Sequence, residues 1–394
     1  MTKIFKTATP SNKKHEKAAW IITTQEAIGR PGECKFQDFN DWSYDYLLNV
    51  VDTLWKESKT LKKYTMPRFT DEFFGLDWYC VLGAYFMCDD GLFRSPEDIS
   101  NGKMNAVFPS LHQVQDKAVA KKLTNAIRTN LPDDIPNHVR DRFSAKSLRK
   151  GGTTTVSMVG GLSIFNVSSR TGHSTGTTVD NYIDPSNPVT SFPAANALHG
   201  VTTLTALPVL PEMNAVGRHN RPQWEALIDR VFAVNVPHFM PDGRHRVILE
   251  VCLASMIRHY ESVLEKCGAQ SLFVTKLTEA ATEVRLRDDA HPGLAPPIVL
   301  LEWSKTIRSD FKMRSRLERI KAMDPDGTRD KTLMAEMASD LKELKNARAT
   351  LCLNWQARRQ SLQSRLMTWK SRLELLQSKS MRLKSSMQRR ISGR

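Results

Sequence analysis

The sequence predicts a mainly α-helical protein with a small antiparallel β-hairpin or sheet, which is an α+β fold. Apolar residues recur every three or four positions through much of the chain, as they do along one face of a helix. One early stretch, residues 44–69, has the β-branched and aromatic residues of strands. The 394 residues exceed one compact core, and the 40% apolar content is enough to bury a substantial core.

The first elements are a helix and the hairpin. Residues 13–29 have the apolar spacing of a helix, and GRPGE (29–33) ends it because glycine and proline interrupt helices. Residues 44–55 then predict one or two strands and residues 64–69 another, with KESKTLKK as the turn between them. Further helices are expected over 71–88, 111–130, 147–159, 163–170 and 177–183.

A change of composition predicts a domain boundary. Residues 184–220 are rich in Pro, Ser, Thr, Asn and Ala and have little helical period, which is typical of a linker. Helical segments resume at 222–233, 244–267 and 298–322, and DPDG makes a turn before one long helix. We therefore expect a first domain over 1–190, a linker over 191–220, a helical region over 221–325 and a basic long helix or coiled coil over 328–391.

The C-terminal segment combines an apolar stripe with a strong positive charge. Leu, Met and Trp residues between Met334 and Met387 keep a spacing of three or four positions, with a break at Arg348 and a shift near Arg358, which predicts an imperfect coiled coil. Residues 345–394 contain thirteen Lys and Arg and one acid, so they carry +12 of the net charge of +15. The expected partners are double-stranded DNA, further copies of this chain bound on DNA, and a protein that binds the apolar stripe.

Composition argues against several other classes of protein. The six cysteines are scattered without CxxC pairs, so neither a disulfide framework nor structural zinc is expected. There is no P-loop and no carboxylate cluster suited to two-metal chemistry, so no metal or cofactor is expected. Without a signal peptide or an apolar run of roughly 18 residues, we expect no membrane partner and an intracellular protein, nuclear if the source is a eukaryote.

Two short motifs at a fixed spacing carry the functional signal. Lys146-Ser-Leu-Arg149 opens a predicted helix, and His173 of a Gly-His pair follows 24 residues after Arg149. Tyr182 lies nine residues beyond His173. Each residue taken alone also has a non-catalytic interpretation: Tyr182 as a core tyrosine, Arg149 as part of a solvated helix start, and His173 as a helix cap. The joint spacing favours an active site.

Two upstream features complete the set. Arg30-Pro-Gly-Glu33 stands at the end of the first helix, although an arginine there is also compatible with an ordinary surface residue. Lys59 lies in the expected hairpin turn, with Lys56 as the alternative. In this order the six residues resemble the catalytic domain of the tyrosine recombinases, the phage integrase family, including enzymes of eukaryotic mobile elements. The resemblance covers about residues 15–185.

The resemblance implies metal- and ATP-independent DNA cleavage and rejoining. Tyr182 would form a 3′-phosphotyrosyl link, while Arg30 and Arg149 would bind the non-bridging oxygens of the phosphate. Lys59 would protonate the leaving 5′-oxygen, and His173 would hydrogen-bond the phosphate. Lys146 stands where a histidine more often assists proton transfer, a KxxR form that also resembles type IB topoisomerases. Neighbouring lysines are expected to bind DNA: Lys56, Lys62, Lys63 and Lys150.

This chemistry explains why such a set is needed. A tyrosine phenol has a pKa near 10, so nearby cations or a base must activate it at neutral pH. The transition state places additional negative charge on two oxygens, and the planar guanidinium of arginine matches them with paired donors. Because the phosphotyrosyl link keeps the phosphoester energy, rejoining requires neither ATP nor metal.

Three functions remain open at this point. The chain is an integrase-like strand transferase, or a DNA-binding or assembly protein that keeps the fold with little or no turnover, or a topoisomerase-like relaxing enzyme. Members of the family usually have a helical core-binding domain of about a hundred residues before the catalytic domain, and only about 12–15 residues precede the first helix here. Another chain, a missing upstream segment, or the region 222–322 would have to supply that clamp.

The basic tail generates a salt-dependence prediction. If it makes about five phosphate contacts, deleting the residues after Asp326 should make the slope of log affinity against log salt shallower by roughly 4–5, because each contact contributes about 0.9. DNA affinity of both chains across a salt series measures this. Identical slopes would leave the tail as a protein-interaction or solubility element.

Overall fold

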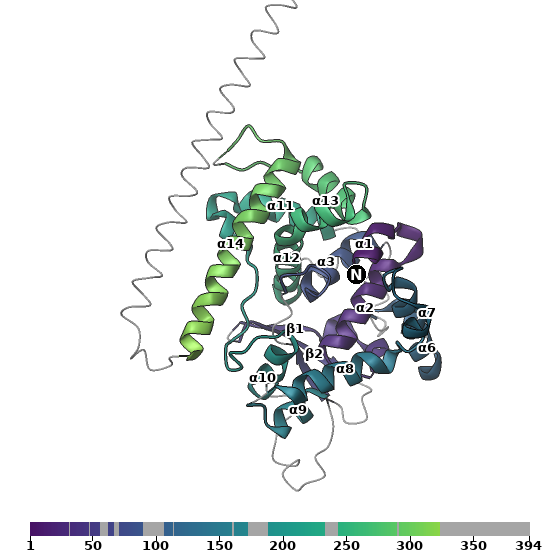
Figure 1. Cartoon of the computed structure of the whole chain (residues 1–394). Helices are drawn as coiled ribbons and strands as arrows, with labels where there is room; N and C mark the ends of the chain where they lie inside the picture. Colours follow the sequence, from purple (N-terminus) through teal and green to yellow (C-terminus); the bar gives the residue numbers. More distant parts are fainter. Residues whose placement is uncertain are drawn as a thin grey trace, which may run out of the picture. The chain divides into compact units, whose positions relative to one another are not determined.

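The computed structural model describes residues 1–30, 32–46, 48–55, 62–66, 71–89, 106–112, 114–159, 161–171, 188–232, 243–289 and 291–323. Within these ranges the protein is mainly helical with one small antiparallel sheet, as the sequence predicts (Figure 1). The helices are α1 (Thr2–Thr7), α2 (Lys14–Glu26), α3 (Trp78–Cys88), α5 (Pro109–His112), α6 (Asp116–Asn130), α7 (Asn137–Arg140), α8 (Ala145–Met158), α9 (Ile164–Thr171), α10 (Pro188–Leu198), α11 (Arg221–Phe232), α12 (Gly243–Cys267), α13 (Leu272–Glu283) and α14 (Pro296–Met323).

Capping side chains determine where two of the helices begin. The Asp77 carboxylate accepts a hydrogen bond from the backbone N–H of Cys80 at 3.0 Å, so α3 begins at Trp78. The helix expected over 71–88 is therefore shorter than predicted, because residues 71–77 form a turn that ends in this cap. At the start of α8, Ser144 and Ser147 form a reciprocal capping box.

The sheet has three strands in the order β1 (Ser43–Asp45), β2 (Val50–Trp55) and β3 (Lys62–Met66), all antiparallel. In the β2–β3 hairpin Trp55 pairs with Lys62, so the six residues between them form the connection. The expected hairpin is thus present. Lys56 and Lys59 belong to that connection and lie outside the described residues, and Lys62 and Lys63 are described only as backbone of β3.

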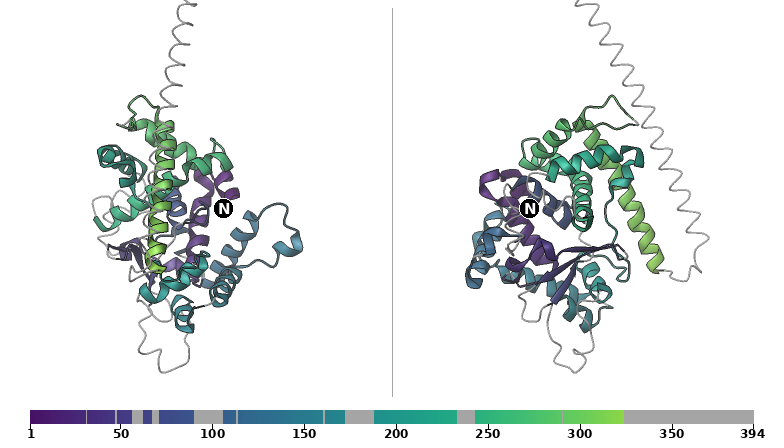
Figure 2. Two further views of the ribbon diagram at one scale, coloured as in Figure 1. Left: turned by 60° about the vertical axis from the view of Figure 1, so that its left-hand side comes forward. Right: turned by 180° about the vertical axis from the view of Figure 1, so that it is seen from behind.

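The helix α3 forms the centre of the hydrophobic core. Every residue from Trp78 to Cys88 is buried, because its sequence WYCVLGAYFMC has no charged position to face water. It packs between α2 and α12, and α12 also packs against α14, the long yellow-green helix of Figure 2. No helix in the described parts of the chain is both long and apolar enough to cross a membrane.

This core joins parts of the sequence that were expected to be separate domains. Its buried residues come from both the first 145 residues and the segment 210–307, and Met1–Met323 form one compact unit. The segment expected as a linker, 191–220, begins with most of α10, whose Phe192 and neighbouring alanines are buried. Alanine is the strongest helix former, so an alanine-rich segment can be helical even among prolines and serines, and composition alone was misleading there. The expected coiled coil over 328–391 lies outside the described residues.

The contact between α3 and α12 generates a stability prediction. A Cβ on Gly83 would lie 2.5 Å from the Met256 sulfur and 3.1 Å from the Cys252 Cβ, so the two helices require glycine there. Gly83→Val should lower the free energy of unfolding by about 1–3 kcal/mol through overpacking. Urea unfolding followed by tryptophan fluorescence measures it.

Gly151→Val is the matched control, because nothing lies within 4 Å of a Cβ at that position of α8. We expect it to change stability by less than about 0.5 kcal/mol. The Met1–Met323 unit should unfold in one transition in all three proteins. Two separate transitions, or equal midpoints for both variants, would contradict the shared core.

Candidate active site

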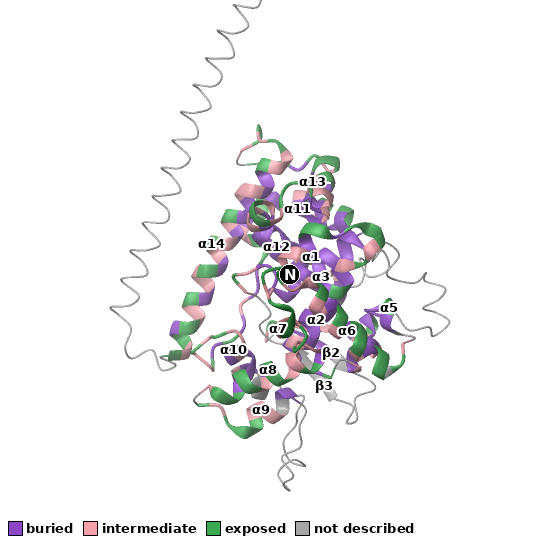
Figure 3. Cartoon of the chain, turned by 45° about the vertical axis from the view of Figure 1, so that its right-hand side comes forward, coloured by how far each residue is buried: buried purple, intermediate pink, exposed green. Residues whose placement is uncertain are grey.

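Two faces of α8 have different environments. Ala145, Gly152 and Val156 point inward and are buried. The outward face, with the four-residue spacing of a helix, is exposed (Figure 3). It consists of Lys146, Lys150, Thr154 and Met158. The helix therefore presents Lys146, predicted to be catalytic, and Lys150, predicted to bind DNA, to solvent, while its other face packs against the protein.

Arg149 lies between these faces and connects two distant segments. Its Nη1 donates to the carbonyl oxygen of Ile28 at 3.1 Å, and its Nη2 donates to the carbonyl oxygen of Thr171 at 2.7 Å. Ile28 is two residues before Arg30, and Thr171 immediately precedes Gly172-His173. One guanidinium thus joins the segments that lead to two other predicted site residues.

The turn that follows α2 has an unusual residue at its centre. The N–H groups of Ile28 and Gly29 bond back to the carbonyls of Gln25 (3.0 Å) and Thr24 (3.2 Å), which is a Schellman motif. Its left-handed position is usually glycine, but here it is Ile28, with φ of 47°. A β-branched residue in this conformation costs roughly 1–2 kcal/mol.

Packing explains why isoleucine occupies this strained position. The Ile28 side chain is fully buried against Val156, Ala194 and Ala197 in a small core between the turn, α8 and α10. Gly152 makes room for it, since a Cβ there would lie 3.2 Å from Ile28 Cγ1. The strain persists because the surrounding contacts determine the turn, a situation that is common at functional sites.

Arg30 emerges from this turn and is held by Glu33. Both Glu33 carboxylate oxygens take part: Oε2 accepts from the Arg30 backbone N–H at 3.1 Å, and Oε1 accepts from Nη1 at 3.3 Å. The Glu33 side chain is only 11% exposed, whereas that of Arg30 is 47% exposed. The RxxE spacing therefore lets Glu33 hold the backbone of Arg30 in place while the guanidinium of Arg30 stays at the surface.

The structure describes three of the six predicted catalytic residues. Arg149 bonds the turn that leads to Arg30, and Lys146 is exposed one turn earlier on the same helix. The structure therefore brings these three to one region, at the meeting of α2 and α8. The other three, Lys59, His173 and Tyr182, lie outside the described residues.

A buried polar chain next to this region was not predicted. Arg170, only 1% exposed, donates through Nη2 to the carbonyl of Glu26, the last residue of α2. The Glu26 carboxylate contacts His199 Nε2 at 2.9 Å, and His199 Nδ1 contacts the Asp71 carboxylate at 3.3 Å. Nothing in the sequence distinguishes these buried polar residues from solvated ones, so no local pattern could have found them.

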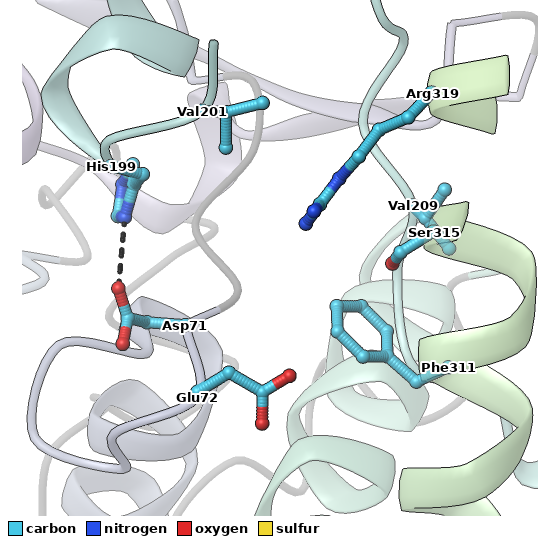
Figure 4. Close-up of a pocket in the computed structure, with 8 residues that line it drawn as sticks. All are labelled: Asp71, Glu72, His199, Val201, Val209, Phe311, Ser315 and Arg319. Atoms are coloured by element: carbon cyan, nitrogen blue, oxygen red, sulfur yellow. Dashed lines mark hydrogen bonds and ion pairs between the residues drawn. The ribbon is translucent and has the colours of Figure 1, made fainter. Parts of the chain in front are cut away.

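His199 is a cation at neutral pH. Burial disfavours its charged form, but the carboxylates of Glu26 and Asp71 outweigh burial and raise the pKa of His199 to about 10. Figure 4 shows the His199–Asp71 contact at the edge of a cavity of about 260 Å³. The Arg319 side chain extends toward that cavity from α14 on the opposite side.

Comparisons with models of protein families, with curated proteins and with solved structures give no match for this chain. A functional assignment must therefore come from its own residues and their geometry.

The raised pKa of His199 predicts a pH-dependent stability. Its ordinary pKa is 6.5, so the stabilisation is fully present below pH 6.5 and is lost as the pH rises toward 10. Between pH 7 and 9 the free energy of unfolding should fall by up to about 1.4 kcal/mol per pH unit relative to His199→Gln. Parallel denaturation series of the two proteins measure this; equal pH slopes would show that His199 is not held as a cation.

Proposed function

We propose that this protein is a DNA strand transferase of the tyrosine recombinase type, acting through a 3′-phosphotyrosyl intermediate on Tyr182. The observation that carries the proposal is the position of Arg149. Its two hydrogen bonds join the turn before Arg30 to the residue before Gly172-His173. The recombinase mechanism requires the segments that bear these motifs to meet, although they are more than a hundred residues apart in the sequence.

The two arginines have complementary properties for binding a phosphate. Arg30 is half exposed and anchored through Glu33, so its guanidinium can meet a ligand from solvent. Arg149 bonds backbone carbonyls through both Nη1 and Nη2, which fixes the plane of the guanidinium before DNA arrives. Such preorganised donors stabilise the charge that develops on the phosphate oxygens.

The charge of the surrounding sequence favours a polyanionic substrate. Between Asp141 and Asp180 the chain has five Lys or Arg and no Asp or Glu. Lys146 and Lys150 lie on the exposed face of α8 within this stretch. A stretch of sequence with five cations and no acid suits the phosphate backbone of DNA, which repels carboxylates.

One observation favours a second candidate, a DNA-binding or assembly protein with little or no turnover. Both described bonds of Arg149 go to backbone carbonyls, which is also what a purely structural arginine does. On this alternative the protein binds DNA and forms no covalent link. A topoisomerase-like activity would use the same intermediate and differ only in releasing the strand without exchange.

The covalent intermediate is the decisive test. A pool of nicked duplexes of randomised sequence traps a recombinase on DNA, because the short cleaved strand diffuses away before rejoining. We expect the wild-type chain to shift on denaturing gels and Tyr182→Phe to give no adduct, since phenylalanine has no nucleophile. Arg149→Lys should lower the adduct rate by 10²–10³-fold, because lysine cannot present paired donors.

Lys276→Gln, on α13 and remote in sequence from the motifs, serves as a control for general charge loss. Its adduct rate should equal that of the wild type.

An adduct that persists in Tyr182→Phe would overturn the assignment of the nucleophile. DNA binding by the wild type with no adduct would support the binding protein instead. Relaxation of a supercoiled plasmid without strand exchange would indicate the topoisomerase-like activity.

A further inference from the structure

The buried polar chain at the end of α2 contains none of the six motif residues. It begins at Arg170 on the last turn of α9, passes through Glu26, and continues through His199 to Asp71. The Arg170 and Glu26 residues are each 1% exposed, and the His199 side chain is 7% exposed. Three charged groups are therefore removed from water at one place.

Stability alone gives a weak reason for such an arrangement. Removing a guanidinium, a carboxylate and an imidazolium from water costs several kcal/mol per ion, and their mutual attraction often only balances that cost. Apolar residues of similar volume frequently serve a fold as well or better. Buried charges do have one property that apolar contacts lack, because hydrogen bonds fix both distance and direction.

In this protein such hydrogen bonds fix the course of the backbone at the end of α2. Arg170 binds the carbonyl of Glu26, and Arg149 binds the carbonyl of Ile28, two residues further on. His199 holds the Glu26 side chain from the end of α10. The strained Ile28 is itself one of the attached residues, and Arg30 lies two residues beyond it. The backbone that carries Arg30 is thus held from α8, α9 and the residue after α10.

We propose that Arg170, Glu26 and His199 are positioning residues, which hold the end of α2 so that Arg30 and Arg149 face one phosphate. This inference rests on the proposed strand-transfer function. In this proposal none of the three positioning residues touches DNA. They act through the backbone, and a displacement of about 1 Å at the reacting groups is enough to lower a rate about a hundredfold.

Single-turnover cleavage of the randomised nicked duplexes tests the proposal on the full chain. Its amplitude reports the fraction of competent protein, and its rate constant reports the geometry of that fraction. For Arg170→Met we expect a rate constant about 10–100-fold lower, as is typical for residues that orient reacting groups. The dissociation constant for the same DNA should stay within about twofold, because no phosphate contact is removed.

Two further variants keep the test valid if Arg170→Met folds poorly. Arg170→Lys retains one donor for the Glu26 carbonyl and should recover part of the rate. His199→Gln keeps a hydrogen bond to Glu26 without the charge, and we expect a rate about tenfold lower. Arg308→Met is the matched control: this α14 arginine bonds Glu261 at 2.9 Å and the carbonyl of Arg258, both on α12. Its rate constant should be that of the wild type.

The outcomes separate this inference from the function on which it rests. An absence of adduct in the wild type would overturn the proposed function and the positioning roles with it. Adducts at the wild-type rate constant in Arg170→Met and His199→Gln, with only the amplitude reduced, would overturn the positioning roles alone. An equal fall in the rate constant of Arg308→Met would do the same, because the effect would then be general. Slow variants with normal DNA affinity beside a normal control would support the proposal.

Discussion

The carbonyl groups at the end of α2 impose the constraint on which the rest of this region depends. The last carbonyls of a helix have no partner within the helix, and a buried one must find a donor elsewhere. Here the donors are two arginines, Arg149 from α8 and Arg170 from α9. Supplying them requires both helices to approach the same turn. Hydrogen bonds thus tie both α8 and α9 to the end of α2.

The shared core explains why the site is not an isolated module. The helix α3 is buried between α2, which leads to the candidate site, and α12, which comes from the C-terminal half of the unit. Apolar residues from positions 4–307 contribute to one cluster. The helix that leads into the turn at Ile28 is therefore packed in a core that includes residues far along the chain. The region expected as a separate helical domain instead supports the same scaffold.

Sequence patterns predicted the helices and strands that can be recognised from a short run of neighbouring residues. Helical period located α2, α6, α8, α9, α11, α12 and α14, and β-branched and aromatic residues on either side of a polar turn located the hairpin. They missed α10, because its alanines and Pro193 have the composition of a linker. The motif spacing predicts Arg30 and Arg149 as site residues, and Arg149 bonds the turn that precedes Arg30. It gave no indication of Arg170 or His199, because burial of a polar residue depends on tertiary contacts that no short pattern contains.

The left-handed Ile28 also limits how this turn can change. Glycine is the residue that adopts its backbone conformation without strain, but glycine would leave the small core beside α8 unfilled. Any residue that fills the core carries a Cβ and keeps the strain. None of the twenty amino acids satisfies backbone and volume together. Substitutions at this one position can therefore only exchange one defect for another, and a better turn would need simultaneous changes at Ile28 and Gly152.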